Sequence, residues 1–396
     1  MKEEKTEEHH QHHKHHKHHK TSLGWRIVGG VLVVAQLAVT VMVVISLFKT
    51  SILDPLWMVI VLFVLVSLFI MNFTLLVLIK RPAKAMRFIC IILSILCIAG
   101  CVWALRYTSA LNNFLDRVSH PSQQIDGGSD KEVLKEPFLV YISGSDSRDG
   151  LQEKTRSDVN ILAAVNPEKG KILLVSIPRD TYVQLHETTG LKDKLTHAGV
   201  YGVDMSKNTI EDFLGVKIDH VIKVSFDTVV RVVDQLDGID IVSDQAMNLK
   251  AENGENCNFV EGKQHVDGDC ALRFSRERKS YETGDRHRGE NQQQVITSII
   301  ERLSGSRNYV MKLPEILDVA ADSFETTFQR DDISSYIRAQ LSNEIDWKVE
   351  SISVDGTGAM EPTYSMGANR PLYVMIPSQE SVDKATKTIK EYLKDE

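Results

Sequence analysis

The sequence has little cysteine and, over most of its length, no excess of positive charge. Only five of its 396 residues are cysteine. Residues 107–396 contain 34 Lys and Arg against 48 Asp and Glu, a net charge of −14. A protein that binds polyanions in general is basic throughout, so this acidic region argues against direct nucleic-acid binding.

Three common catalytic signatures are also absent. The chain has no Walker lysine loop, no H-E-x-x-H zinc motif and no G-x-S-x-G elbow, because residues 144–148 read GSDSR. The six histidines beyond residue 105 are scattered, and only His197 lies in a motif-like setting. We expect a structural role for His197, so the arginines and carboxylates are the better candidates for chemistry.

Arginine is concentrated in one place. Five of the 19 arginines lie between Arg273 and Arg288, in the stretch RFSRERKSYETGDRHR. The planar guanidinium group binds phosphate through two parallel hydrogen bonds and keeps its charge at any working pH. A dense arginine cluster in an acidic region therefore predicts a local anion site.

The first hundred residues contain three long apolar segments, at residues 27–48, 56–79 and 88–105. Each reaches or nearly reaches the roughly 20 residues that a helix needs to cross a bilayer. A cleaved signal peptide would not be followed by two further spans, so residues 27–105 are predicted to form three transmembrane helices that anchor the protein.

The charged residues beside these segments predict their orientation. Six Lys and Arg precede the first segment and four more lie between residues 80 and 87, whereas the first loop has only Lys49. Because positive residues favour the cytoplasmic side, we expect the N-terminus in the cytoplasm and the region after residue 105 outside the cell.

The expected domains follow from these boundaries. Residues 1–26 contain HHQHHKHHKHHK and are predicted to be a disordered, histidine-rich cytoplasmic tail, either binding divalent metal or lying solvated near anionic lipid. Residues 106–136 are predicted to be a linker, because they contain Pro121, Gly127 and Gly128 and show no periodicity. Residues 137–396 are predicted to form one extracellular domain.

Two cysteines fall in this external domain. Cys257 and Cys270 form an even pair on the oxidising side of the membrane, which permits one disulfide. The sequence leaves open whether their side chains meet. The other three cysteines, Cys90, Cys97 and Cys101, lie in the third apolar segment and are expected to be small apolar residues of that helix.

The external domain alternates short and long apolar patterns. Short runs rich in β-branched residues predict strands at residues 138–142, 159–165, 171–177, 221–226 and 239–242. Helical periods occur at residues 205–213, 228–236, 292–303 and 382–393. We therefore predict an α/β fold with a layered α-β-α architecture and a mixed sheet covered on both faces.

Charged residues lie at the ends of three predicted strands. Asp146 follows the first strand, Arg156 and Asp158 precede the second, and Arg179 follows the third. Ligands of open α/β sheets bind beyond strand ends, so these residues are candidates for one rim. Carboxylate oxygens are preferred ligands of Mg²⁺, and arginines with such a metal can position and neutralise a phosphoryl group. These charges could equally pair with each other on the surface.

Six segments together resemble the LytR–CpsA–Psr family. They are GSDSR at 144–148, RSD at 156–158, SIPRDTYV at 176–183, KLTHAGVYG at 194–202, VDGDCALRFSRER at 266–278 and GDRHRGENQQQV at 284–295. The resemblance extends from about residue 138 to about residue 303. One departure is Asn291, at a position where many relatives have arginine.

The resemblance implies roles for individual residues. It makes Asp146 and Asp158 the ligands of Mg²⁺ (or Mn²⁺), and it makes Arg156, Arg179 and Asp158 the catalytic residues. The diphosphate-binding set that it implies consists of Arg156, Arg179, Arg276, Arg278, Arg288 and Gln292. Arg273 and Arg286 match no family position and are left out of the set.

The implied activity is that of a membrane-anchored phosphotransferase of a Gram-positive bacterium. Such an enzyme moves an anionic or capsular glycopolymer, often teichoic-acid-like, from a polyprenyl-diphosphate carrier onto peptidoglycan. Two alternatives stay open: a non-catalytic receptor for lipid-linked polymer, and a regulator with a transcriptional-attenuator role. The receptor would use the arginines equally well, but the two aspartates would repel phosphate unless a metal were bound.

Overall fold

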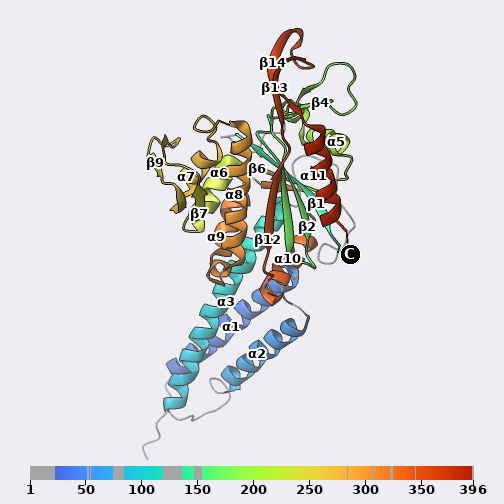
Figure 1. Ribbon diagram of the computed structural model, residues 1–396. Coiled ribbons are helices and arrows are strands. Elements are labelled where there is room, and N and C mark those ends of the chain that lie inside the picture. Colours follow the sequence, from blue (N-terminus) through green and yellow to red (C-terminus); the bar gives the residue numbers. More distant parts are fainter. Residues whose placement is uncertain are drawn as a thin grey trace, which may run out of the picture. The chain divides into compact units, whose positions relative to one another are not determined.

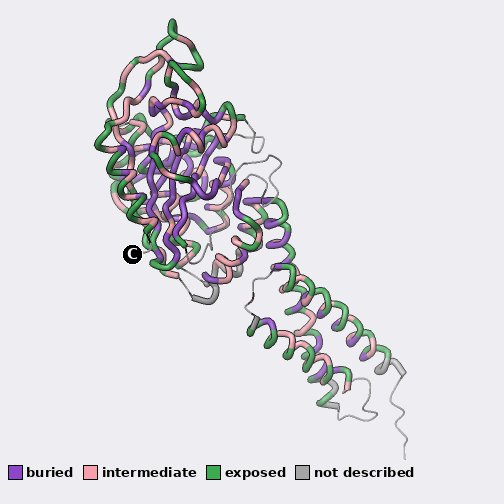
Figure 2. The backbone as a smooth tube through the Cα atoms, turned by 90° about the vertical axis from the view of Figure 1, so that its right-hand side faces the viewer, coloured by how far each residue is buried: buried purple, intermediate pink, exposed green. Residues whose placement is uncertain are grey.

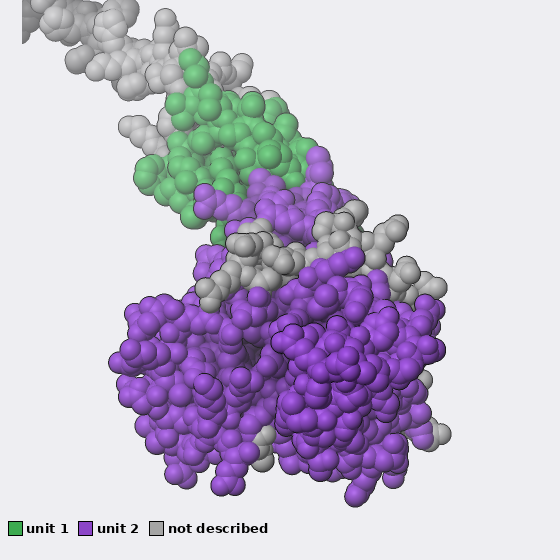
Figure 3. Space-filling model, turned by 90° about the horizontal axis from the view of Figure 1, so that it is seen from above, with its two compact units in different colours: residues 1–44, 57–104 green, residues 45–56, 105–396 purple. Residues whose placement is uncertain are grey.

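The structure, a computed structural model, describes residues 23–50, 53, 55–74, 84–118, 136–146, 154–282, 284–305, 307–321, 324–343 and 345–394. The chain divides into two compact units, one of residues 1–44 and 57–104 and one of residues 45–56 and 105–396 (Figure 3). The histidine-rich segment of the expected tail lies outside the described residues.

Three helices occupy the N-terminal region: α1 (Leu23–Thr50), α2 (Pro55–Phe73) and α3 (Lys84–Val118). All three are long and apolar enough to cross a membrane. Most of their large apolar side chains are exposed, as a membrane-facing surface requires. Within the first unit, the Asn72 side chain donates a hydrogen bond of 2.9 Å to Gln36, which joins α2 to α1.

The prediction of a linker from residue 106 is wrong at its start, because α3 continues to Val118. Leu111 and Leu115 are fully buried against the end of α9 (Arg307–Ala321). Helical stability in proteins comes largely from such tertiary packing of an apolar face, which the local sequence does not reveal.

A six-stranded mixed sheet forms the centre of the second unit, in the order β11-β6-β1-β2-β3-β12. The strands β1, β3, β6 and β12 run in one direction, and β2 and β11 run in the other. Their bounds are β1 (Phe138–Ser145), β2 (Val159–Asn166), β3 (Lys171–Ser176), β6 (His220–Ser225), β11 (Phe324–Thr326) and β12 (Lys348–Ser353). The C-terminal ends of four strands and the beginning of β2 therefore share one edge.

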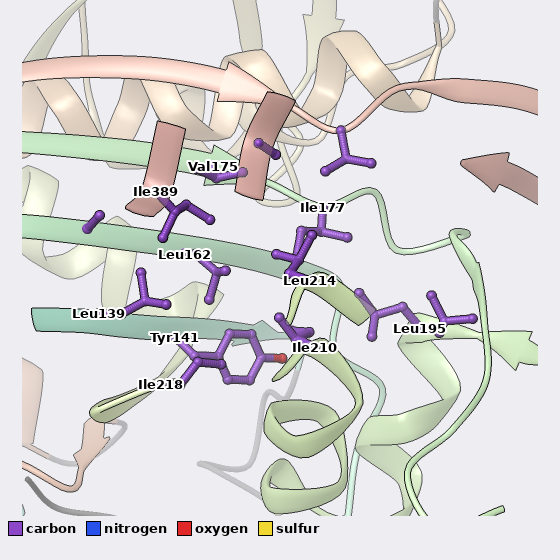
Figure 4. Packing of buried hydrophobic residues seen from close by; sticks show 14 of the residues in the cluster. Leu139, Tyr141, Leu162, Val175, Ile177, Leu195, Ile210, Leu214, Ile218 and Ile389 are labelled. Atoms are coloured by element: carbon purple, nitrogen blue, oxygen red, sulfur yellow. The ribbon is translucent and has the colours of Figure 1, made fainter. Parts of the chain in front are cut away.

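Helices cover both faces of this sheet, which confirms the predicted layered α/β fold (Figure 1). They are α5 (Val203–Leu214) and α11 (Gln379–Tyr392) on one face, and α8 (Asp285–Ser304) and α10 (Arg330–Asn343) on the other. Leu139 and Tyr141 pack toward Ile210 and Ile389 of the first pair (Figure 4), whereas Phe138 belongs to the core of the opposite face. The central strands are accordingly almost entirely buried (Figure 2), since successive side chains of a strand point to opposite faces.

A smaller apolar core lies beside the sheet. It is built from α6 (Phe226–Gln235), α7 (Gly268–Ser275) and the strands β7 (Ile239–Ser243), β8 (Met247–Lys250), β9 (Asn256–Phe259) and β10 (Gly262–Val266). The sequence left open whether Cys257 and Cys270 meet, and the structure joins them by a disulfide. This bond links β9 to α7.

Shorter elements complete the unit. They are β4 (Tyr182–Val183), β5 (Asp193–Lys194), α4 (Leu195–Ala198), a 3-10 turn (Gly199–Tyr201) and the long hairpin of β13 (Gly356–Thr363) and β14 (Gly367–Pro377). Met375 of β14 donates a backbone hydrogen bond of 2.8 Å to the carbonyl oxygen of Asp180. The hairpin is thereby attached to the segment that follows β3.

Candidate functional site

The two aspartates predicted to bind metal are brought to one edge by the pairing of β1 and β2. Gly144 lies opposite Val159, and the Asp158 amide donates a hydrogen bond of 2.9 Å to the Gly144 carbonyl oxygen. A Cβ atom at Gly144 would lie 2.8 Å from the Val159 Cβ, so this close approach requires glycine. Asp146 follows two residues later on the same edge, as the strand-end pattern predicted.

Arg179 lies at the centre of the site, just beyond β3. Its Nη1 donates a hydrogen bond of 2.6 Å to Oδ1 of Asp158, and its Nε lies 3.9 Å from Oδ2 of Asp180. Burial disfavours the charged form of Arg179, but the pair with Asp158 and the charges of Asp180 and Asp285 outweigh it and raise the pKa of Arg179. The guanidinium group is therefore held charged in a site where only about a quarter of its side chain is exposed.

Arg288 enters the same site from the first turn of α8. Its backbone approaches β3 closely because Gly289 follows it, where a Cβ would lie 2.6 Å from the Ser176 hydroxyl oxygen. Burial lowers the pKa of Arg288, although the negative charge of Asp285 acts to raise it. Burial also raises the pKa of Asp285 itself. Arg288 and Asp285 approach to 2.9 Å without the alignment of a hydrogen bond.

Several buried side-chain atoms around Arg179 and Arg288 lack hydrogen-bond partners. Among the described residues, Nε of Arg179, Nε of Arg288 and both carboxylate oxygens of Asp285 have no hydrogen-bond partner. Buried polar groups in proteins nearly always have one, and the exceptions mark functional sites or positions for water and ligands. Both guanidinium groups thus keep one buried N–H donor without a hydrogen-bond partner among the described residues.

Arg276 and Arg278 reach the site from the end of α7. Arg276 donates a hydrogen bond of 2.9 Å to Asp146, pairs with Glu252 and lies 5.3 Å from the ring centre of Phe226. Arg278 is exposed, and its charge acts on Asp285. The structure therefore brings Arg276 and Arg278 of the distant arginine cluster close to the aspartates of the strand edge.

Two members of the predicted diphosphate set have other positions. Arg156 is exposed and forms no ion pair with any residue that the structure describes. Its backbone packs against Gly199, where a Cβ would lie 3.4 Å from the Arg156 carbonyl carbon. Gln292 is buried one turn after Arg288 on α8. Arg148, which accompanies Asp146 in the sequence motif, lies outside the described residues.

Three charged residues of the site were not predicted: Asp180, Asp285 and Lys194. Lys194 Nζ donates a hydrogen bond of 2.8 Å to Asp180, so Asp180 is shared between Lys194 and Arg179. Asp180 and Asp285 supply the negative charge that balances Arg179 and Arg288. The only signal in the sequence was that each aspartate lies within three residues of a predicted arginine.

A hydrogen-bond network supports the turn that carries Asp158. The Tyr141 hydroxyl donates to Oδ1 of Asn160 at 2.7 Å, and the Ser157 hydroxyl donates to the same atom at 2.7 Å. Ser143 lies 3.0 Å from Ser157. All four residues are buried, so the network holds the chain on both sides of Asp158 in place.

His197 has the structural role expected from the sequence. Its Nδ1 lies 2.7 Å from Oδ1 of Asp193, which is fully buried and also accepts hydrogen bonds from the backbone amides of Lys194 and Ser365. The adjacent Thr196 amide donates to the Arg179 carbonyl oxygen at 2.9 Å. The segment around His197 therefore supports the backbone of Arg179.

The substitution Asp193→Asn should lower the free energy of unfolding at pH 7 by about 3 kcal/mol. It removes the negative charge that faces His197 and the backbone amides of Lys194 and Ser365. Burial raises the pKa of Asp193, but the hydrogen bonds from His197, Ser365 and Lys194 outweigh it and keep that pKa below its usual value. The stabilisation is therefore present above the unfolded value near pH 4 and is lost as the pH falls through the folded pKa.

Chemical denaturation of the full chain in detergent, followed by tryptophan fluorescence at pH 7 and pH 3, measures this effect. The exposed Asp318 provides the matched control, and Asp318→Asn should change stability little at either pH. A loss for Asp193→Asn that is equally large at pH 3 would contradict the assignment of an ionised, hydrogen-bonded carboxylate.

Asp146 and Asp158 are the two residues that the sequence suggested as metal ligands. Among the described residues, no group of three or more His, Cys, Asp or Glu side chains is arranged to hold a metal ion. Asp146 and Asp158 each use one oxygen, Oδ2 and Oδ1 respectively, in an arginine pair. Two carboxylates with substrate phosphates are a common arrangement for Mg²⁺, so the donors present are compatible with that ion.

The chain is similar to several known proteins over most of its second unit. The sequence profile of the LytR_cpsA_psr family matches residues 108–391. The polyisoprenyl-teichoic acid–peptidoglycan teichoic acid transferase TagU of Halalkalibacterium halodurans is 29% identical over 307 residues, which are 75% of this chain and 94% of that protein. TagU of Bacillus anthracis is 31% identical over 274 residues, covering 67% of this chain and 86% of its own length.

The fold agrees with a solved structure of this group. The crystal structure of Bacillus subtilis TagV matches with a TM-score of 0.55 and 30% identity, covering 65% of this chain and 98% of that one. The order of the six sequence motifs and the match over residues 108–391 lead to one conclusion. The chain belongs to the LytR_cpsA_psr family.

Proposed function

We propose that this protein transfers an anionic glycopolymer of the teichoic-acid type from a polyisoprenyl-diphosphate carrier onto peptidoglycan. The observation that carries the proposal is the pair of guanidinium groups of Arg179 and Arg288 with unpartnered Nε donors at the strand edge. A diphosphate supplies the acceptor oxygens that such donors require. The names of the TagU relatives, as transferases of polyisoprenyl-linked teichoic acid to peptidoglycan, support the same activity.

The reaction that fits these groups is phosphoryl transfer. Arg179 and Arg288 bind the diphosphate from the inside of the site, while Arg276 and Arg278 approach it from the end of α7. A peptidoglycan hydroxyl attacks the phosphorus nearest the glycan, and the P–O bond to the second phosphate breaks. Polyprenyl phosphate leaves and takes up the proton that the hydroxyl loses. The arginines hold the reacting groups in line and neutralise the charge that develops on the leaving phosphate.

Asp146 and Asp158 would hold Mg²⁺ or Mn²⁺ in this proposal. Each has an oxygen that its arginine pair does not use. The ion would polarise the phosphoryl oxygens and compensate the repulsion between the carboxylates and the diphosphate. The buried network holds the chain on both sides of Asp158, and the pair with Arg179 couples the Asp158 carboxylate to the diphosphate clamp.

In this proposal the site faces the outside of the cell. The three apolar helices suit an integral membrane anchor, and the excess of Lys and Arg before α1 and between α2 and α3 favours a cytoplasmic N-terminus. The catalytic unit then faces the cell wall, where both peptidoglycan and the lipid carrier are accessible. A role as a transcriptional regulator would require a different mechanism, because the acidic external region offers no general nucleic-acid surface.

A reconstitution experiment tests the proposal. The full chain in liposomes receives a lipid-diphosphate-linked teichoic acid, peptidoglycan fragments and Mg²⁺, and the formation of polymer-linked peptidoglycan is measured. We expect multiple turnovers for each protein molecule. Stoichiometric binding of the lipid-linked donor without turnover would instead identify a receptor.

Removal of the metal ligands tests the cofactor. The double substitution Asp146→Asn/Asp158→Asn should reduce transfer by about a hundredfold or more and abolish its dependence on added Mg²⁺. Exposed Asp227 and Asp318 provide a control with the same change of charge, Asp227→Asn/Asp318→Asn, which should keep the wild-type metal response. Chelation that leaves wild-type transfer unchanged would exclude a metal-assisted step.

A further inference from the structure

A second polar cavity adjoins the outer arginines of the site. It has a volume of about 310 Å³, and its walls come from the β8–β9 hairpin, from α7 and from the segment after α7. The lining residues are Lys250, Glu252, Leu272, Arg273, Arg276, Glu277, Arg278 and Lys279. Arg276 and Arg278 belong both to this cavity and to the diphosphate site. The cavity therefore adjoins the candidate diphosphate site at Arg276 and Arg278, and neither Arg179 nor Arg288 lines it.

This cavity is basic within an acidic region. Five of its eight lining residues are Lys or Arg, and the two glutamates are already paired. Glu252 pairs with Arg276, and Glu277 pairs with Arg273. Lys250 and Lys279 are exposed and form no ion pair with any residue that the structure describes. The cavity thus offers two uncompensated cations beside the shared arginines, which favours an anionic ligand.

Glu277 organises the wall after α7. It is buried, and its carboxylate accepts hydrogen bonds from the backbone amides of Lys279 and Ser280 at 2.7 and 2.8 Å. These contacts hold residues 277–280 in a turn that directs Lys279 to the cavity. Burial raises the pKa of Glu277, but the backbone donors and Arg273 outweigh it and keep that pKa below its usual value. The wall is therefore fixed rather than formed by loose surface lysines.

The opposite wall is fixed by a covalent bond. The Cys257–Cys270 disulfide joins β9 to α7, and Lys250 lies opposite Asn256 in the same hairpin as Cys257. The Asn253 side chain adds a hydrogen bond of 2.7 Å to Asp269 at the start of α7. These links keep Lys250 at a constant position relative to the helix that carries Arg273 and Arg276.

We propose that this basic cavity binds a phosphate group of the donor polymer, at least one repeat beyond the carrier diphosphate. The inference rests on the proposed function and adds a substrate preference to it. A polymer whose repeats contain phosphate gains a second ionic contact, whereas a neutral polymer gains none. The site therefore selects polyol-phosphate chains over uncharged capsular chains.

Two lipid-linked donors distinguish this cavity from the diphosphate site. One bears only a disaccharide on the polyprenyl diphosphate, and the other bears the same disaccharide extended by poly(glycerol phosphate). For the full chain in liposomes, Lys250→Glu/Lys279→Glu should raise KM for the extended donor by about tenfold or more. The same variant should change KM for the short donor less than about twofold and should leave kcat unchanged for both.

The control variant carries the same change of charge at the far edge of the sheet. Lys171 and Lys348 are exposed partners in the β3–β12 ladder, so Lys171→Glu/Lys348→Glu should leave both KM values unchanged. Equal increases of KM for both donors in the cavity variant, or no increase for either, would overturn the inference. Failure of the wild-type protein to transfer even the short donor would instead reject the proposed function.

The disulfide provides an independent measurement on the same cavity. Cys257→Ala/Cys270→Ala frees the hairpin that carries Lys250 from α7, so we expect a several-fold increase of KM for the extended donor and a smaller one for the short donor. An unchanged preference between the two donors would show that the disulfide does not position the cavity wall.

Discussion

Replacement of Arg179 by alanine should reduce polymer transfer by about a thousandfold. Arg179 interacts with several charged residues of the site. It pairs with Asp158 at 2.6 Å, and its charge acts on Asp285 and Arg288. Its Nε donor is buried and unpartnered among the described residues, so it is available for the diphosphate. Without Arg179, the charge that develops on the leaving phosphate loses a hydrogen-bond donor. Single-turnover rates of the full chain in liposomes measure the decrease in transfer.

The conservative variant Arg179→Lys separates charge from geometry. Lysine keeps the cation but lacks the planar fork, so we expect transfer to stay at least tenfold below wild type. Circular dichroism of both variants checks that the fold survives. Wild-type rates for Arg179→Lys would show that only a positive charge is needed, and wild-type rates for Arg179→Ala would remove Arg179 from the mechanism.

Arg288 and Arg286 form a matched pair two residues apart on α8. Arg288 is buried beside Asp285, whereas Arg286 is nearly half exposed and pairs with Asp355 at 2.8 Å. We expect Arg288→Ala to reduce transfer by about a hundredfold or more, because it removes a buried donor from the diphosphate clamp. We expect Arg286→Ala to leave transfer within about twofold of wild type, since surface ion pairs contribute little.

The same steady-state assay compares both variants. Arg288→Gln keeps most of the side-chain volume and serves as a second variant if Arg288→Ala disturbs the packing of α8. Equal effects at positions 286 and 288 would contradict the geometry, because only Arg288 faces the site. A loss confined to Arg286→Ala would place the diphosphate on the opposite side of the helix.

Much of this site could be predicted from the sequence because its parts follow local rules. Short β-branched runs marked β1, β2 and β3, and the charges at their ends had to share an edge once the sheet was formed. The arginine cluster at residues 273–288 stood out against the acidic composition of residues 107–396. Family motifs then connected the cluster to residues more than 100 positions earlier.

The remaining features depend on contacts that local patterns do not contain. The sequence did not reveal the roles of Asp180 and Asp285, because a carboxylate beside an arginine in a sequence is usually a solvent-exposed surface residue. The extension of α3 to Val118 follows from burial of Leu111 and Leu115 against a helix two hundred residues later. The Cys257–Cys270 disulfide stayed open for the same reason, since its formation depends on how β9 meets α7.

The central claim concerns which bond of the carrier is broken, and the identity of the released lipid tests it directly. Attack at the phosphorus nearest the glycan leaves one phosphate on the product, so the lipid released by the full chain should be polyprenyl monophosphate, in amounts equal to the polymer transferred. Mass spectrometry of the lipid fraction after reaction measures this ratio. Release of polyprenyl diphosphate would mean that the glycosidic carbon is attacked instead and would contradict the phosphotransfer mechanism.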